Sequence, residues 1–166
     1  MALILQEPGF IRQKKAMSCW FACLKMLLQW HEGSRSIGDA AVSDLASWIH
    51  PRSYGDIPLA FRARHGLEFR DQALTSVAEL EDLLRRYGPF MGGGKVGKAL
   101  MAFGPRMFGH AILIYGVTAN GLILHHDPQA GAHHTIKWAN YERLQDGELL
   151  LKTNGPRVVQ VAAGGG

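Results

Sequence analysis

The chain has 166 residues, of which 47% are hydrophobic and 19% charged, and 18 basic against 14 acidic side chains give a formal net charge of +4. We expect one folded domain over residues 1–166, with a core from about residue 10 to 155 and loose termini. The densest basic cluster is only Arg12, Lys14 and Lys15, so the charge does not favour nucleic-acid binding. No apolar run approaches the ~20 residues that span a bilayer, which argues against membrane insertion.

The residues after Ser18 predict a buried helix from Cys19 to about Trp30. Its apolar side chains recur at helical spacing and cover most of the circumference: Cys19, Trp20, Cys23, Leu24, Met26, Leu27, Leu28 and Trp30. A helix that is apolar nearly all round is normally buried between other elements, so we expect it at the centre of the domain, with Gly33 ending it.

Two further helices are predicted before the chain changes character. One runs from about Asp39 to Ile49, and the other follows the capping box Ser76–Glu79 and ends at Gly88. We expect the two ends of the chain, Met1 to Glu7 and Ala162 to Gly166, to be loose.

The second half of the sequence predicts strands. They are Pro89–Met91, His110–Val117, Leu122–Asp127 and about His133–Trp138, and a turn at Ala119-Asn120-Gly121 joins the second and third. Helices first and antiparallel strands later indicate an α+β fold, in which an N-terminal helical part packs on a C-terminal antiparallel β-sheet.

A glycine-rich segment, Gly92 to Ala99, resembles a phosphate-binding loop but fails at its last position, because Ala99 has no hydroxyl for Mg²⁺. We expect a flexible loop there instead, able to act as a lid. Four histidines flank Asp127, yet neighbouring strand residues such as His125 and His126 point to opposite faces and cannot easily share one metal. We therefore expect neither a metal nor a cofactor.

Two cysteines cannot form a disulfide framework, and their positions indicate different roles. Cys19 falls at the first turn of the predicted helix, where unpaired backbone N–H groups and the helix dipole lower the pKa of a thiol. Cys23 lies one turn further along and is interpreted as a packed core thiol.

The segment Gln13-Lys-Lys-Ala-Met-Ser-Cys19-Trp20-Phe-Ala22 resembles papain-like cysteine peptidases. That family places a glutamine six residues before its nucleophile, an aromatic and a small residue after it, and the cysteine at the start of a long central helix. The resemblance implies that Cys19 is the nucleophile and that Gln13 and the Cys19 backbone N–H stabilise the oxyanion. Trp20, Gly92, Gly93 and Gly94 are candidates to border the substrate cleft.

His110 opens an apolar strand, and the next strand ends in Asp127. The start of one antiparallel strand lies near the end of its successor, so Asp127 can approach His110 and orient its imidazole. A two-residue turn, however, would set His110 opposite Gly131, which leaves Asn140 or a neighbour as an alternative orienting residue.

The order Cys, Gly-His-Ala before a strand, and Asp-Pro resembles compact bacterial branches of the papain-like clan, namely the leader peptidase domains of bacteriocin exporters and injected effector proteases. That resemblance implies an endopeptidase acting on a protein substrate, with cleavage after Gly-Gly. Met1 to Phe10 lacks the basic region and cleavage site of a signal peptide, so we expect synthesis in the cytoplasm. We further expect export by a specialised system, action as an effector toxin in a recipient cell, and an immunity or inhibitor protein as partner.

Two alternatives stay open at this point. A Cys/His peptidoglycan amidase shares a thiol at a helix start and a histidine on a strand. A binding domain could also have kept the papain-like fold and lost the chemistry. Preferential alkylation of Cys19 over Cys23 near neutral pH would separate an activated thiol from the second alternative.

Overall fold

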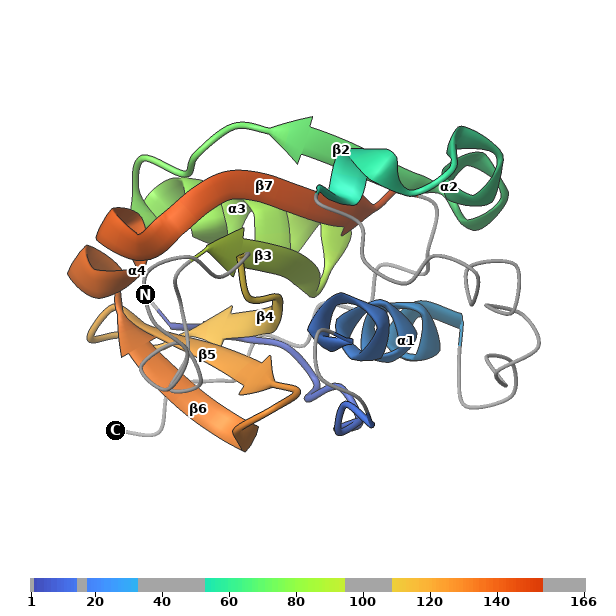
Figure 1. Ribbon diagram of the computed structural model, residues 1–166. Coiled ribbons are helices and arrows are strands. Elements are labelled where there is room, and N and C mark those ends of the chain that lie inside the picture. Colours follow the sequence, from blue (N-terminus) through green and yellow to red (C-terminus); the bar gives the residue numbers. More distant parts are fainter. Residues whose placement is uncertain (1, 15–17, 33–52, 95–108, 154–166) are drawn as a thin grey trace.

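The computed structural model describes residues 2–14, 18–32, 53–94 and 109–153, and shows helices packed on an antiparallel sheet (Figure 1). The α+β prediction is confirmed. The helices are α1 (Cys19–Glu32), the short 3-10 helix η2 (Tyr54–Asp56), α2 (Leu59–His65), α3 (Val77–Tyr87) and α4 (Trp138–Leu144). The strands are β1 (Leu3–Ile4), β2 (Leu67–Asp71), β3 (Phe90–Gly94), β4 (Ile112–Val117), β5 (Leu122–Asp127), β6 (Gly131–Lys137) and β7 (Gln145–Lys152).

The strands form one antiparallel sheet in the order β2-β7-β3-β4-β5-β6, and β1 adds to β4. The prediction that the N-terminal residues are loose is wrong, since Leu3 pairs with Val117 and Ile4 with Gly116. Leu3 is fully buried, and burying an apolar side chain stabilises the folded chain enough to order a two-residue strand. Among the described residues, no helix has the length and apolar character to cross a membrane.

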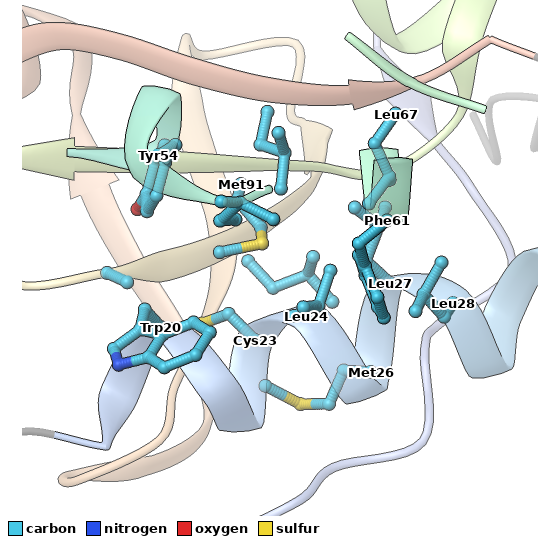
Figure 2. Packing of buried hydrophobic residues seen from close by; sticks show 14 residues of the cluster. Trp20, Cys23, Leu24, Met26, Leu27, Leu28, Tyr54, Phe61, Leu67 and Met91 are labelled. Atoms are coloured by element: carbon cyan, nitrogen blue, oxygen red, sulfur yellow. The ribbon is translucent and has the colours of Figure 1, made fainter. Parts of the chain in front are cut away.

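Helix α1 covers one face of the sheet and forms the first core, as predicted. Its buried side chains meet Met91 of β3, Leu113 of β4 and Leu150 of β7, and η2 and α2 close the cluster from the other side (Figure 2). The predicted stop at Gly33, the helix predicted over Asp39–Ile49 and the C-terminal glycines lie outside the described residues.

Helix α3 packs in a second core on the opposite face. Successive strand residues point to opposite sides of a sheet, so Ile112 and Ile114 of β4 face this cluster while Leu113 faces α1. The predicted capping box is present in part: the Ser76 side chain accepts a hydrogen bond from the Glu79 backbone N–H, but the Glu79 carboxylate accepts from the Thr75 backbone N–H and not from that of Ser76.

The hairpin of β4 and β5 differs from the predicted register in a way that matters for the site. The turn has three residues, because Thr118 N–H donates to the Leu122 carbonyl, and the pairing shifts again between Ile114 and Gly116. The pair Leu113 and His126, extended by one residue, sets Asp127 opposite Ile112. The longer turn and the β-bulge together shift the register by two residues. Asp127 therefore lies opposite a position two residues from His110, whereas the predicted register places it four residues away.

Several helices and strands of the structure differ from the predicted ones. Trp138 begins α4 instead of ending a strand, and β2, β7, α2 and α4 were not predicted. Gly92, Gly93 and Gly94, expected in a flexible loop, are buried residues of β3, while 95–99 lie outside the described residues. Gly92 pairs with both β4 and β7, Gly94 pairs with Gln145 of β7, and the Gly94 carbonyl accepts from the His110 N–H, which together hold this end of β3 in a strand.

Candidate active site

Cys19 is the first residue of α1 and its thiol is partly exposed. The Ser18 carbonyl accepts the first hydrogen bond of the helix from the Ala22 N–H, so the sulfur lies beside the positive end of the helix. The Ala111 backbone N–H, which precedes β4, donates to the Cys19 sulfur at 3.5 Å. The surroundings of this thiol therefore favour its negatively charged form.

His110 lies between β3 and β4 and is buried. Its backbone N–H donates to the Gly94 carbonyl at 2.8 Å, which fixes the start of β4 against the end of β3. Its side chain hydrogen bonds to Cys19 on one side, and its Nε2 lies 2.7 Å from Oδ1 of Asp127 on the other. The imidazole is thus held between a thiol and a carboxylate.

Asp127 is the last residue of β5 and is almost fully buried. Besides His110, its Oδ1 accepts hydrogen bonds from the backbone N–H groups of Gln129 (2.9 Å) and Ala130 (3.0 Å). A carboxylate held by three donors is a well-oriented partner for the imidazole. The alternative residue Asn140 is exposed on α4, and the partner that the structure gives His110 is Asp127.

The charges of these three groups are mutually supporting. Burial alone raises the pKa of Cys19, but the hydrogen bond and the positive charge of His110 outweigh it and lower the pKa below its ordinary value. Burial lowers the pKa of His110, but its bonds to Asp127 and Cys19 raise it to about 9. Burial raises the pKa of Asp127, and the His110 bond more than reverses this, to about 2. All three shifts favour a thiolate beside an imidazolium.

The second cysteine, Cys23, has a raised pKa where that of Cys19 is lowered. It is fully buried in the α1 core, and burial raises its pKa well above the ordinary value, with the negative charges of Cys19 and Asp127 adding to the effect. A neutral, enclosed thiol is a poor nucleophile and is not accessible to an electrophile.

Gln13 is half-buried, and its backbone N–H donates to the Pro128 carbonyl at 3.0 Å. This bond puts the Gln13 backbone against the turn that begins at Asp127. The contacts of the Pro128 carbonyl and the Ala111 N–H were not predicted, because every residue carries the same backbone carbonyl and nearly every one the same N–H.

The candidate cleft residues divide into two sets. Trp20 is buried in the α1 core, beside Cys23 and beneath η2 (Figure 2). The second set, Gly92, Gly93 and Gly94, forms the end of β3. The Gly94 carbonyl accepts a hydrogen bond from the His110 backbone N–H. Tyr54, which sequence reasoning also missed, donates its hydroxyl proton to the Gly92 carbonyl at 2.9 Å and ties η2 to this strand.

The residues brought together define a thiol hydrolase of the papain type: a cysteine at the start of a central helix, a histidine at the start of a strand and an acid at the end of the next strand. Within the described residues, no group of three His, Cys, Asp or Glu side chains is arranged to hold a metal ion. The histidines that invited a metal interpretation lie on opposite faces of β5, with His125 beside His134 and His126 beside Phe10.

Comparison with known proteins gives the same class. The family model described as papain-like cysteine protease AvrRpt2 matches residues 6–146, and the chain belongs to this family. It is a cysteine protease. Among solved structures, the fold is similar to the peptidase domain of Streptococcus ComA, a bi-functional ABC transporter involved in a quorum sensing pathway. That match has a TM-score of 0.60 and 16% identity, and covers 89% of this chain and 100% of that one. No curated protein matches the sequence significantly.

Proposed function

We propose that the protein is an endopeptidase in which Cys19 attacks the peptide carbonyl, His110 transfers the proton and Asp127 orients His110. The observation that carries this assignment is the continuous chain of contacts from the partly exposed Cys19 sulfur through the buried His110 imidazole to the buried Asp127 carboxylate. The lowered pKa of Cys19 and the raised pKa of His110 supply a nucleophile and an acid in the same resting state.

The reaction proceeds in two halves. The Cys19 thiolate adds to the carbonyl carbon, and the negative charge that develops on oxygen is stabilised by the Cys19 backbone N–H and the Gln13 carboxamide. His110 gives its proton to the departing amine, which leaves a thioester on Cys19. His110 then takes a proton from water, and the resulting hydroxide attacks the thioester carbon. The carbon–sulfur bond breaks, which releases the carboxylic acid product and leaves Cys19 as the thiolate.

The substrate is a protein cut after a Gly-Gly pair. Two features support it: the resemblance of the Gly-His-Ala and Asp-Pro motifs to leader peptidase domains, and the ComA peptidase domain as a structural neighbour. Fluorogenic peptides that differ only in Gly-Gly, Gly-Ala, Ala-Gly and Ala-Ala test this. Rapid cleavage of the first alone is expected, and equal cleavage of all four would refute it.

The biological setting is that of an effector toxin, which enters a recipient cell and is neutralised in its producer by an immunity or inhibitor protein. The family, described by the name AvrRpt2, supports this setting. Expression of the wild-type chain in a host without such a partner should arrest growth, while Cys19→Ala should not. Unimpaired growth with soluble, active enzyme present would refute the toxin role.

The rival amidase activity has its own test. Purified peptidoglycan sacculi incubated with the enzyme should stay intact while a protein substrate is cut. Release of muropeptides with protein left intact would reverse the assignment.

A further inference from the structure

His126 is a buried polar side chain that the proposed mechanism does not use. It lies on β5 next to Asp127 and is fully buried. The centre of its ring lies 4.8 Å from that of Tyr115, with the two planes tilted by 41°, and 5.6 Å from that of Phe10 in a T-shaped pair. A histidine in such an aromatic enclosure is costly unless both ring nitrogens are hydrogen bonded.

Both nitrogens of His126 have partners, and the partners fix its protonation. Nε2 lies 2.8 Å from the Pro8 carbonyl oxygen, which can only accept, so Nε2 carries the proton. Nδ1 accepts from the His133 backbone N–H at 3.4 Å and therefore carries none. The ring is a neutral imidazole that donates one hydrogen bond to the N-terminal segment.

That segment, Pro8–Gln13, is attached to the end of β5 and the turn after it at three further points. Phe10 contacts the His126 ring, the Arg12 guanidinium donates to the Gln129 carbonyl at 3.1 Å, and the Gln13 N–H donates to the Pro128 carbonyl at 3.0 Å. The same turn supplies the N–H groups that hold Asp127. One short stretch of chain therefore supports both the triad acid and the segment that ends in Gln13.

We propose that His126 is a positioning residue for the oxyanion glutamine: by anchoring the Pro8 carbonyl, it holds segment 8–13 on the turn after β5 and places the Gln13 carboxamide. The inference rests on the proposed function, because it requires Gln13 to stabilise the oxyanion. His126 touches neither His110 nor Cys19 in any contact that the structure gives, so its effect on the reaction passes through the segment.

A double-mutant cycle tests this route. His126→Leu removes the donor at similar volume, His126→Gln keeps an N–H at the reach of Nε2, and each is made with and without Gln13→Ala. Values of kcat and KM are measured per mole of Cys19 thiol titrated by alkylation, so that only folded, reactive enzyme is counted. His125→Leu is the matched control, since His125 is buried on the other face of β5 beside His134.

The expected pattern is a non-additive loss in kcat. Gln13→Ala should lower kcat by about 10²-fold, the effect of removing one oxyanion donor. His126→Leu should lower kcat by about tenfold with little change in KM, because small displacements of catalytic groups are costly, and His126→Gln should recover most of it. In the Gln13→Ala background, His126→Leu should change kcat less than about twofold, as for residues acting in one unit.

Each outcome decides a separate point. Equal losses from His126→Leu in both backgrounds, or a loss no larger than that of His125→Leu, would overturn the positioning role alone. An unchanged kcat in Gln13→Ala would refute the oxyanion role and this inference with it. If His126→Leu does not fold, Arg12→Ala loosens the same segment from an exposed position and must show the same non-additivity with Gln13→Ala.

Discussion

The Nε2 atom of His110 lies 2.7 Å from Oδ1 of Asp127, and the carboxylate is 1% exposed. Because two backbone N–H groups also hold that carboxylate, it stays ionised and favours the protonated imidazole. The same imidazole hydrogen bonds to Cys19, and its positive charge lowers the pKa of the Cys19 thiol. We expect this relationship to determine the pH dependence of the proposed reaction.

We predict that kcat/KM falls as the pH rises through about 9, because the imidazolium that protonates the leaving amine is lost at the pKa of His110. Asp127→Asn removes the carboxylate that raises this pKa, so the alkaline limb should move to lower pH. Since general acid catalysis is impaired, kcat/KM at pH 7 should fall by about 10²-fold. A pH-rate profile with a peptide substrate measures both. Asn140→Ala is the control and should leave the profile unchanged; an unmoved alkaline limb in Asp127→Asn would contradict the role of Asp127.

The two thiols should react at very different rates with iodoacetamide. Near neutral pH, Cys19 should be alkylated faster because its pKa is lowered, while Cys23 should stay unmodified because burial raises its pKa and encloses it. Peptide mapping by mass spectrometry identifies the labelled cysteine. His110→Ala should slow labelling of Cys19, and similar rates for the two cysteines in the wild type would show that Cys19 is not activated.

Much of this arrangement could be predicted because local signals agreed with the tertiary structure. The apolar spacing of α1, the Ser76 cap of α3 and the turn residues before β5 each specify their element within a few residues of sequence. The pairing of His110 with Asp127 was predicted only in outline. It depends on a bulge near Tyr115 that no residue pattern indicates.

The elements that were missed depend on distant partners. Gly92, Gly93 and Gly94 have the composition of a loop, and they continue β3 because Gly92 pairs with both β4 and β7 and Gly94 pairs with β7. Strand β1 is only two residues long and is ordered by pairing with β4, over a hundred residues away in sequence. Local propensity carries no information about such partners.

Gly94 should be intolerant of a side chain. Its φ is +131°, and a Cβ there would meet the backbone of Leu144 and Gln145, while its carbonyl holds the His110 N–H. We expect Gly94→Ala to lower the free energy of unfolding by about 3 kcal/mol or more and to impair kcat. Gly121→Ala is the matched control. It also has a positive φ, of +70°, but nothing lies within 4 Å, so a cost of about 1 kcal/mol is expected. Equal costs in urea unfolding would contradict the crowding at Gly94.

The first strand should contribute to stability. Leu3 is fully buried in the second core, so Leu3→Ala should lower the free energy of unfolding by about 2–5 kcal/mol. Ile4 is its half-buried neighbour, and Ile4→Ala should cost about 1 kcal/mol. Urea unfolding followed by tryptophan fluorescence measures both. A negligible effect at Leu3 would mean that β1 is not ordered in solution.

The most direct test of the central claim compares new protein N-termini in a cell lysate treated with the wild type, Cys19→Ala or Cys23→Ala. Mass spectrometry of the labelled N-termini should find the same new cleavage sites with the wild type and Cys23→Ala, and none with Cys19→Ala. Cleavage that persists in Cys19→Ala would contradict the assignment of Cys19 as the nucleophile.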